Sequence, residues 1–266
     1  MNGADVRIDD DFELTVAEGV RFQTLYVRVS EPERDAPSAE IPPEHLRKLA
    51  VEGSVDAQIG WARRLLHGHG AERDPEAAFR WFKMAARSGD AEALNMVGRC
   101  FELGWGVAQN LVEAADWYRR AADKHHAWGE FNLASLYAQG RGVPYDERAA
   151  LSLLVRSARR GNAKAMNMIG RYREAKAADK RPGSSFHWYR WAARRGCFRG
   201  QFRHGCHLVT TGRVTDGLSW LRASFSQAPG DYRQEALDFL RHDAHPALRE
   251  FAREQVQSGG EQGPST

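Results

Sequence analysis

The sequence nearly repeats itself about every 36 residues. Turns of the form Gly-x-Gly begin at Gly68, Gly104 and Gly140. Three further columns keep this spacing: small residues at Ala62, Gly98, Ala134, Gly170 and Gly205; mostly tryptophan at Trp81, Trp117, Leu153, Trp188 and Trp220; and mostly alanine at Ala86, Ala122, Ala158, Ala193 and Phe225. A fixed period of this size is typical of stacked supersecondary units, so it predicts a solenoid.

Within one repeat the apolar residues recur with helical spacing, as Phe79, Phe82 and Ala86 do. A first helix precedes them, and the Gly-x-Gly turn joins the two because glycine tolerates positive φ. After the turns come Asp74, Asn110 and Asp146, which we expect to cap the second helices. Each repeat is therefore predicted to be a helix hairpin.

Stretches such as 91–98, 104–107 and 114–122 resemble the Sel1-like repeat family, relatives of the tetratricopeptide repeats. The resemblance covers roughly residues 44–226 and is strongest in the second and third repeats. The fourth repeat departs from it by replacing the glycine turn with residues 176–183, and the fifth by its Thr210-Thr211-Gly212 turn. The resemblance implies a mainly α fold: a right-handed α/α superhelical solenoid of helix-hairpin repeats.

These sequence patterns divide the chain into six segments. Alternating residues on both sides of Gly19 predict a β-hairpin, which either packs on the first helices or pairs with a second chain. The segments are 1–29 with this hairpin, a Pro-rich linker at 30–43, a capping half-repeat helix at 44–54, about five repeats at 55–226 of which the last two are degenerate, capping helices at 227–257, and a disordered tail at 258–266.

Composition argues against a membrane protein and a secreted disulfide scaffold. No apolar run approaches the roughly 20 residues needed to span a bilayer, and the polar, acidic start is unlike a signal peptide. The cysteines Cys100, Cys197 and Cys206 show no disulfide framework, so we expect a soluble protein of the cytoplasm. Nucleic-acid binding is disfavoured because the net charge is only +3.

The sequence shows no recognisable set of residues for a catalytic or metal site. The Gly-x-Gly turns follow the repeat and are structural, and Glu102 and Glu174 occupy equivalent positions two repeats apart, too far for acid–base cooperation. His204 and His207 share a helix face, with Cys206 nearby, but no spacing completes a ligand set, so packing roles are favoured. We expect no enzymatic activity, no catalytic residue, no metal and no cofactor.

Binding is the favoured function because stacked hairpins create a concave surface lined by their first helices. If the register resembles that of tetratricopeptide repeats, arginines at equivalent positions form an electropositive ladder there, and asparagines hold a ligand's backbone. The predicted groove residues are Arg63, Asn95, Arg99, Asn132, Asn167 and Arg171. The alternative is that all six are merely solvated polar residues.

The sequence therefore predicts a non-enzymatic scaffold or adaptor that binds another protein, through an acidic or carboxylate-bearing peptide. An accessory or regulatory subunit of a neighbouring enzyme is the alternative, with a nucleic-acid-binding repeat protein third. We expect no membrane partner. A monomer is favoured, and a dimer through the N-terminal hairpin stays open.

Overall fold

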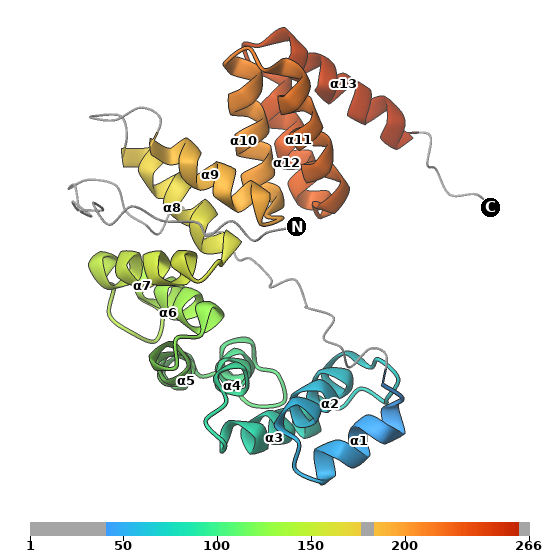
Figure 1. Cartoon of the computed structure of the whole chain (residues 1–266), viewed down its shortest axis with the longest axis vertical. Helices are drawn as coiled ribbons and strands as arrows, with labels where there is room; N and C mark the ends of the chain where they lie inside the picture. Colours follow the sequence, from blue (N-terminus) through green and yellow to red (C-terminus); the bar gives the residue numbers. More distant parts are fainter. Residues whose placement is uncertain (1–40, 177–183, 261–266) are drawn as a thin grey trace, which may run out of the picture. The chain divides into compact units, whose positions relative to one another are not determined.

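The computed structural model describes residues 41–176 and 184–260, and these form thirteen α-helices and no strand (Figure 1). The predicted β-hairpin of residues 12–29, most of the linker and the altered turn of the fourth repeat lie outside the described residues. The helices are α1 Pro43–Val51, α2 Val55–His67, α3 Pro75–Ala86, α4 Ala91–Leu103, α5 Leu111–Asp123, α6 Ala127–Gln139, α7 Glu147–Arg159, α8 Ala163–Lys176, α9 Ser184–Arg194, α10 Phe198–Thr210, α11 Val214–Gln227, α12 Gly230–Arg241 and α13 Pro246–Gly260.

The helices belong to two compact units. The N-terminal unit ends at Arg160 and holds α1 to α7, and the C-terminal unit begins at Gly161 and holds α8 to α13. Successive helices pair as hairpins within them: α2 with α3, α4 with α5 and α6 with α7 in the first, and α8 with α9 and α10 with α11 in the second. The division between the units falls inside the repeated region, where the sequence period gives no sign of it.

The second helices begin at the residues predicted to cap them. Asp74 Oδ1 accepts a 2.8 Å hydrogen bond from the Ala77 N–H, and Asp146 Oδ1 accepts one of 2.9 Å from Ala149. Asn110 accepts from both Val112 and Glu113. Each cap satisfies backbone donors that the first turn of a helix leaves without a partner, and the predicted caps are confirmed.

The Gly-x-Gly turns end the first helices and also pack against the preceding hairpin. Gly104 closes α4 in the left-handed region, with φ of 73°. Gly106 also has positive φ, and a Cβ there would lie 1.9 Å from the Pro75 carbonyl oxygen at the start of α3. Gly142 approaches Leu111 at the start of α5 in the same way. The second glycine of the turn is therefore required by the contact between successive hairpins.

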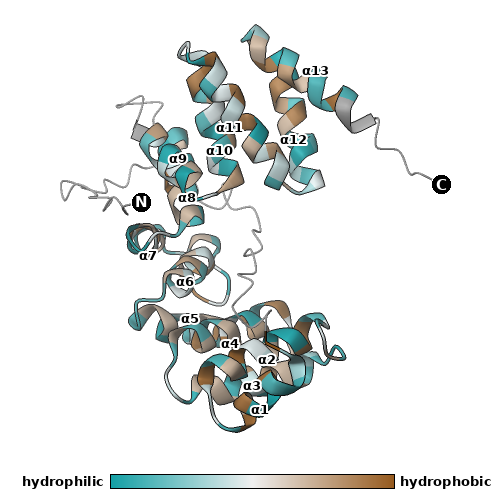
Figure 2. Cartoon of the chain, turned by 45° about the vertical axis from the view of Figure 1, so that its right-hand side comes forward, coloured by the Kyte–Doolittle hydropathy of each residue, from teal (hydrophilic) through white to brown (hydrophobic). Residues whose placement is uncertain are grey.

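The core of the N-terminal unit is built from the repeated columns. The helices carry both hydrophobic and hydrophilic residues (Figure 2), and most of the hydrophobic ones are buried between helices. Helix α1 adds Leu46 and Ala50, at 1% and 0% exposure, to the core of the first hairpin. The Gln58 side chain of α2 donates a 3.1 Å hydrogen bond to the Ala50 carbonyl oxygen. Helix α1 thus covers the apolar face that the first hairpin would otherwise expose.

The core of the C-terminal unit gathers large side chains from α10 to α13. Phe225 and Phe251 meet edge to face, with ring centroids 5.4 Å apart. The inward residues that helical spacing predicts for α12 and α13 are all buried: Ala236, Leu237, Leu240, Leu248, Phe251 and Ala252. Helix α13 continues to Gly260, three residues into the segment predicted to be disordered, because a helix that is already formed adds residues at little cost.

Candidate functional site

The first helices of the N-terminal unit carry the predicted groove residues Arg63, Asn95, Arg99 and Asn132. Helices α4 and α6 contact each other directly. The Asn132 side-chain amide donates a 2.9 Å hydrogen bond to Asn95 Oδ1 across this contact. Asn95 is only 1% exposed, so Asn132 is the member of the pair that faces the surface. We call Arg63, Arg99 and Asn132 the first-helix surface.

Arg63 connects α2 to α4 on this surface. Its guanidinium donates a hydrogen bond to Glu92 Oε1, and the two side chains are 23% and 44% exposed. An ion pair open to water contributes at most about 1 kcal/mol of stability. Glu92 nevertheless offsets the charge of Arg63, so Arg63 contributes less positive potential than the sequence indicates.

Arg99 is held by the turn that follows its own helix. Its guanidinium lies over the Trp105 ring, 4.7 Å from the ring centroid. A cation–π contact at such a partly exposed site is worth about 0.5–1 kcal/mol. This contact occupies the face of the guanidinium and restricts its orientation, while its N–H donors stay in the plane of the group. Arg99 is therefore positioned by a residue of the repeat's own turn.

Asn167 and Arg171 lie on α8, in the C-terminal unit. Asn167 is 4% exposed, and its Oδ1 has no hydrogen-bond partner among the described residues. Burial lowers the pKa of Arg171, and the nearby Arg203 and Arg199 act in the same direction. Two of the three ladder arginines thus belong to one unit and the third to the other, and a common peptide-binding role for them stays a prediction.

Glu102 and Glu174, the repeated carboxylates, each contact a tyrosine of their own hairpin. Tyr118 donates to Glu102 at 2.6 Å, and Tyr189 donates to Glu174 at 2.7 Å. Burial raises the pKa of Tyr189, and the negative charge of Glu174 adds to this effect. The two glutamates lie in different units and hold the first helix of a hairpin to the second.

His204 and His207 both lie on α10, where they contact aromatic rings. The His207 ring stacks on Phe186 with centroids 3.6 Å apart, and the His204 ring meets Trp220 at 5.6 Å. All three cysteines are free, and burial raises the pKa of the Cys206 thiol to about 12. In the part of the chain that the structure describes, no three His, Cys, Asp or Glu side chains are grouped to hold a metal ion.

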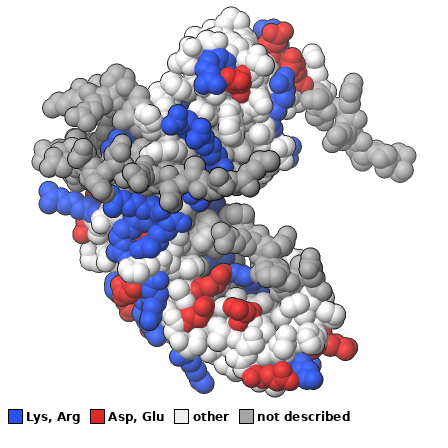
Figure 3. Space-filling model, viewed as in Figure 1, with Lys and Arg blue, Asp and Glu red and all other residues white. Residues whose placement is uncertain are grey.

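Both signs of charge occur on the N-terminal unit, with basic side chains gathered around α7 (Figure 3). Some of these basic side chains form ion pairs with a buried carboxylate of the same unit. Arg156 and Arg160 pair with the fully buried Glu130 carboxylate, at 2.8 Å and 3.3 Å. Two of the arginines at this helix are therefore committed to a structural contact between α6 and α7.

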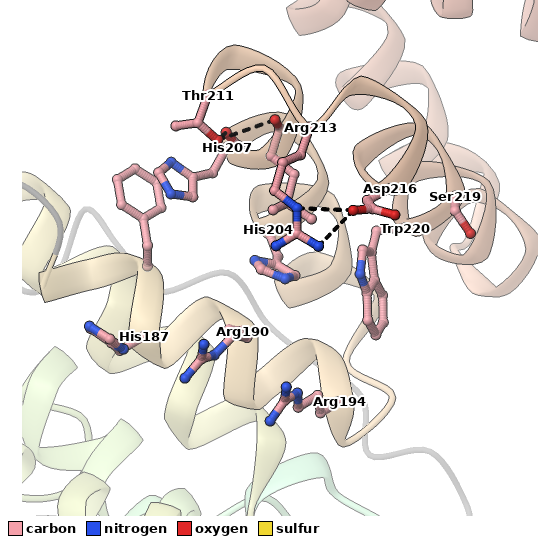
Figure 4. A pocket seen from close by; sticks show the side chains of 12 residues that line it. His187, Arg190, Arg194, His204, His207, Thr211, Arg213, Asp216, Ser219 and Trp220 are labelled. Atoms are coloured by element: carbon pink, nitrogen blue, oxygen red, sulfur yellow. Dashed lines mark hydrogen bonds and ion pairs between the residues drawn. The ribbon is translucent and has the colours of Figure 1, made fainter.

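A cavity of about 920 Å³ in the C-terminal unit contains site residues that the sequence analysis missed. Helices α9, α10 and α11 line it, and His187, Arg190 and Arg194 contribute the basic side chains of α9 (Figure 4). These three residues recur at i, i+3 and i+7, which places them on one helix face. That spacing is the signal for them in the sequence, whereas the predicted histidine pair, His204 and His207, lies on α10.

Among described residues no helix combines the length and the apolar character that crossing a bilayer requires.

The chain has similarity to several curated proteins over short stretches. It is 33% identical over 134 residues to chitin synthase regulatory factor 3 of Schizosaccharomyces pombe, which covers 48% of this chain and 14% of that protein. It is 39% identical over 80 residues to protein sel-1 homolog 2 of Rattus norvegicus, covering 30% of this chain and 12% of the relative. The chain thus spans less than a fifth of the length of these relatives.

Solved structures share the fold. A Sel1 repeat protein from Oxalobacter formigenes aligns with a TM-score of 0.66 at 21% identity, covering 83% of this chain and 98% of that one. The protective antigen c5321 of uropathogenic Escherichia coli, which has an SLR fold, aligns with a TM-score of 0.60 at 26% identity and covers 84% of this chain and 49% of that one.

The family model described as Sel1 repeat matches residues 55–90, 91–126, 129–162 and 163–197, which together make up more than half of the chain. The matches follow the hairpins from α2 to α9, and the fifth predicted repeat lies beyond them. The matched residues include the glycine turns of the first three repeats and the small-residue column from Ala62 to Gly170. The chain belongs to the Sel1 repeat family.

Proposed function

We propose that this chain is a non-enzymatic adaptor that binds another protein through the first-helix surface. Stacked hairpins use such surfaces for binding because successive repeats present equivalent side chains at a regular interval. The partner segment is an extended peptide that carries acidic side chains or a terminal carboxylate. The chain works in the cytoplasm, where its three unpaired cysteines stay reduced.

The contact between Asn132 and Asn95 is the observation that carries this proposal. It joins two successive first helices at a position where both side chains are polar. A polar contact between repeats adds little to stability compared with an apolar one. Because Asn132 is partly exposed at the α4–α6 contact, the pair is consistent with a surface kept polar for a ligand's backbone amides and carbonyls.

The arginines favour an acidic segment. A guanidinium matches a carboxylate with two parallel hydrogen bonds, and Arg99 is already oriented by Trp105. Glu92 competes for Arg63, so a partner carboxylate must displace this exposed ion pair. Displacement costs little because an exposed pair is weak.

A second candidate is an accessory subunit that regulates an enzyme. The names of the relatives favour it: one is a regulatory factor of chitin synthase, and another is a component of an E3 ubiquitin-protein ligase in Arabidopsis thaliana. In this case the chain supplies no chemistry and the same surface holds the enzyme or its substrate protein.

The test is binding to an array of immobilised peptides, each made once with a free terminal carboxylate and once amidated. We expect wild-type chain to prefer peptides rich in Asp and Glu, or with a free carboxylate. The double variant Arg63→Ala/Arg99→Ala should lose that preference.

The matched control is Arg80→Ala/Arg87→Ala, which removes the same charge from exposed positions at α3, a second helix of the same unit. It should bind like the wild-type chain. If both double variants lose the preference for acidic peptides equally, net charge alone drives binding. If the wild-type chain shows no preference for acidic peptides, the proposal of an acidic partner is refuted. Circular dichroism checks that each variant keeps its helices.

A further inference from the structure

The cavity of the C-terminal unit lies between the second helix α9 and the helices α10 and α11. It shares no residue with the first-helix surface, and the inference drawn from it does not depend on the function proposed above. Its volume of about 920 Å³ is within the range of about 300–1,000 Å³ that is usual for small-molecule sites. Figure 4 shows the basic side chains of α9 on one side of it, with His204, Arg213 and Trp220 on the other.

Two of its arginines have no acidic partner in the part of the chain that the structure describes. Within the described residues, neither Arg190 nor Arg194 forms an ion pair, and the Arg190 Nε is buried without a hydrogen-bond partner. Arg213 differs, because its guanidinium donates to Asp216 at 2.6 Å and 2.9 Å. The net charge contributed by the arginines and Asp216 is therefore close to +2, and it is concentrated at Arg190 and Arg194.

His204 lies in this cavity, where the positive charges of the arginines affect its pKa. The side chain is 8% exposed, and its Nδ1 has no hydrogen-bond partner among the described residues. Burial, followed by the charges of His207, Arg190, Arg194 and Arg213, lowers the pKa of His204 to about 4. A buried polar atom without a partner destabilises the fold, and a bound ligand that forms a hydrogen bond with it would remove this cost.

We propose that this cavity binds a small phosphorylated molecule, with its phosphoryl group held between Arg190 and Arg194. A phosphoryl group carries close to two negative charges at neutral pH and offers three acceptor oxygens. It therefore matches the guanidinium groups of Arg190 and Arg194 together better than a single carboxylate does. Trp220 supplies a flat apolar wall for the remainder of the molecule.

Isothermal titration calorimetry of the full chain with inorganic pyrophosphate tests the site directly. We expect saturable binding to the wild-type chain, and about tenfold weaker binding for each arginine removed, in Arg194→Gln and in Arg190→Gln/Arg194→Gln. Arg194 is exposed, so the single variant should fold even if the double variant does not. The matched control Arg222→Gln/Arg233→Gln removes the same charge from exposed positions of α11 and α12 in the same unit and should bind normally.

Three results would overturn the proposal: no binding of pyrophosphate to the wild-type chain at millimolar concentration, equal loss in the control double variant, or equal affinity for an acetylated, amidated tetraglutamate peptide. Two further probes distinguish the source of the phosphoryl group. Tighter binding of adenosine diphosphate than of pyrophosphate supports a free small molecule with a flat ring against Trp220. Tighter binding of a phosphoserine peptide than of adenosine diphosphate would contradict the small-molecule assignment.

Discussion

Tyr118 donates a 2.6 Å hydrogen bond to the Glu102 carboxylate, and this contact joins the two helices of one hairpin. Tyr189 and Glu174 repeat it in the C-terminal unit at 2.7 Å. Beside each tyrosine the first helix has a glycine, Gly98 or Gly170, against which the ring packs. The repeated glutamates therefore have the same packing contact in both units.

Removal of the hydroxyl tests this contact. We expect Tyr118→Phe to lower the free energy of unfolding by about 1–2 kcal/mol, because a buried ring loses its bond to a charged acceptor. Tyr145→Phe is the control, since Tyr145 is 42% exposed and its 3.3 Å bond to Glu147 is open to water. In urea denaturation, the control should lose less than about 0.5 kcal/mol of its free energy of unfolding. If both variants lose the same stability, the hydrogen bond between Tyr118 and Glu102 does not stabilise the hairpin more than an exposed one.

The glycine beneath the ring gives a second prediction. A Cβ at Gly98 would lie 2.7 Å from two atoms of the Tyr118 ring, so Gly98→Ala should cost about 1–3 kcal/mol through overpacking. Gly230 has no atom within 4 Å of such a Cβ, so Gly230→Ala should be neutral or slightly stabilising. Thermal denaturation of both variants decides the point. A Gly98→Ala chain as stable as the wild type would mean that the ring can move aside.

The two glycines of one turn should respond differently to the same substitution. Both have positive φ, so Ala at either position costs about 1–2 kcal/mol in backbone strain. Only Gly106 also meets backbone, since its Cβ would lie 1.9 Å from the Pro75 oxygen, whereas the nearest atom to Gly104 is 3.7 Å away. Gly106→Ala should therefore destabilise clearly more than Gly104→Ala in urea denaturation. The opposite order would rule out the contact between hairpins as the reason for the second glycine.

His204 should make the fold sensitive to acid. Its folded pKa of about 4 lies below the ordinary 6.5, so the unfolded chain binds a proton there at a higher pH than the folded chain does. Its contribution to stability is present above pH 6.5 and is lost as the pH falls toward 4. The groups that face it are His207 on α10, Arg190 and Arg194 on α9, and Arg213 with its partner Asp216 at α11.

His204→Gln should therefore lose less stability than the wild-type chain between pH 7 and pH 4.5, as measured by urea denaturation at both values. His187→Gln is the control, because His187 lines the same cavity but is exposed. If His204→Gln and wild type lose the same amount, the acid sensitivity arises elsewhere.

The hairpins, their caps and their turns can all be predicted from the amino-acid sequence. These features are local or periodic: Asp74 caps a helix that begins at the next residue, and Gly104 and Gly106 adopt positive φ through their own lack of a Cβ. The buried columns follow as well, because helical spacing places Leu248, Phe251 and Ala252 on one face. The family match rests on the same repeated residues.

The contacts between polar side chains, in contrast, depend on the packing of the folded chain. Asn95 and Asn132, or Arg63 and Glu92, lie on different helices, and no local rule brings their side chains into contact. The division after Arg160 and the cavity near Arg190 likewise depend on how whole hairpins pack. Periodicity specifies the face of a helix on which a residue lies, but the charge that a neighbouring element places opposite it is fixed only when the chain has folded.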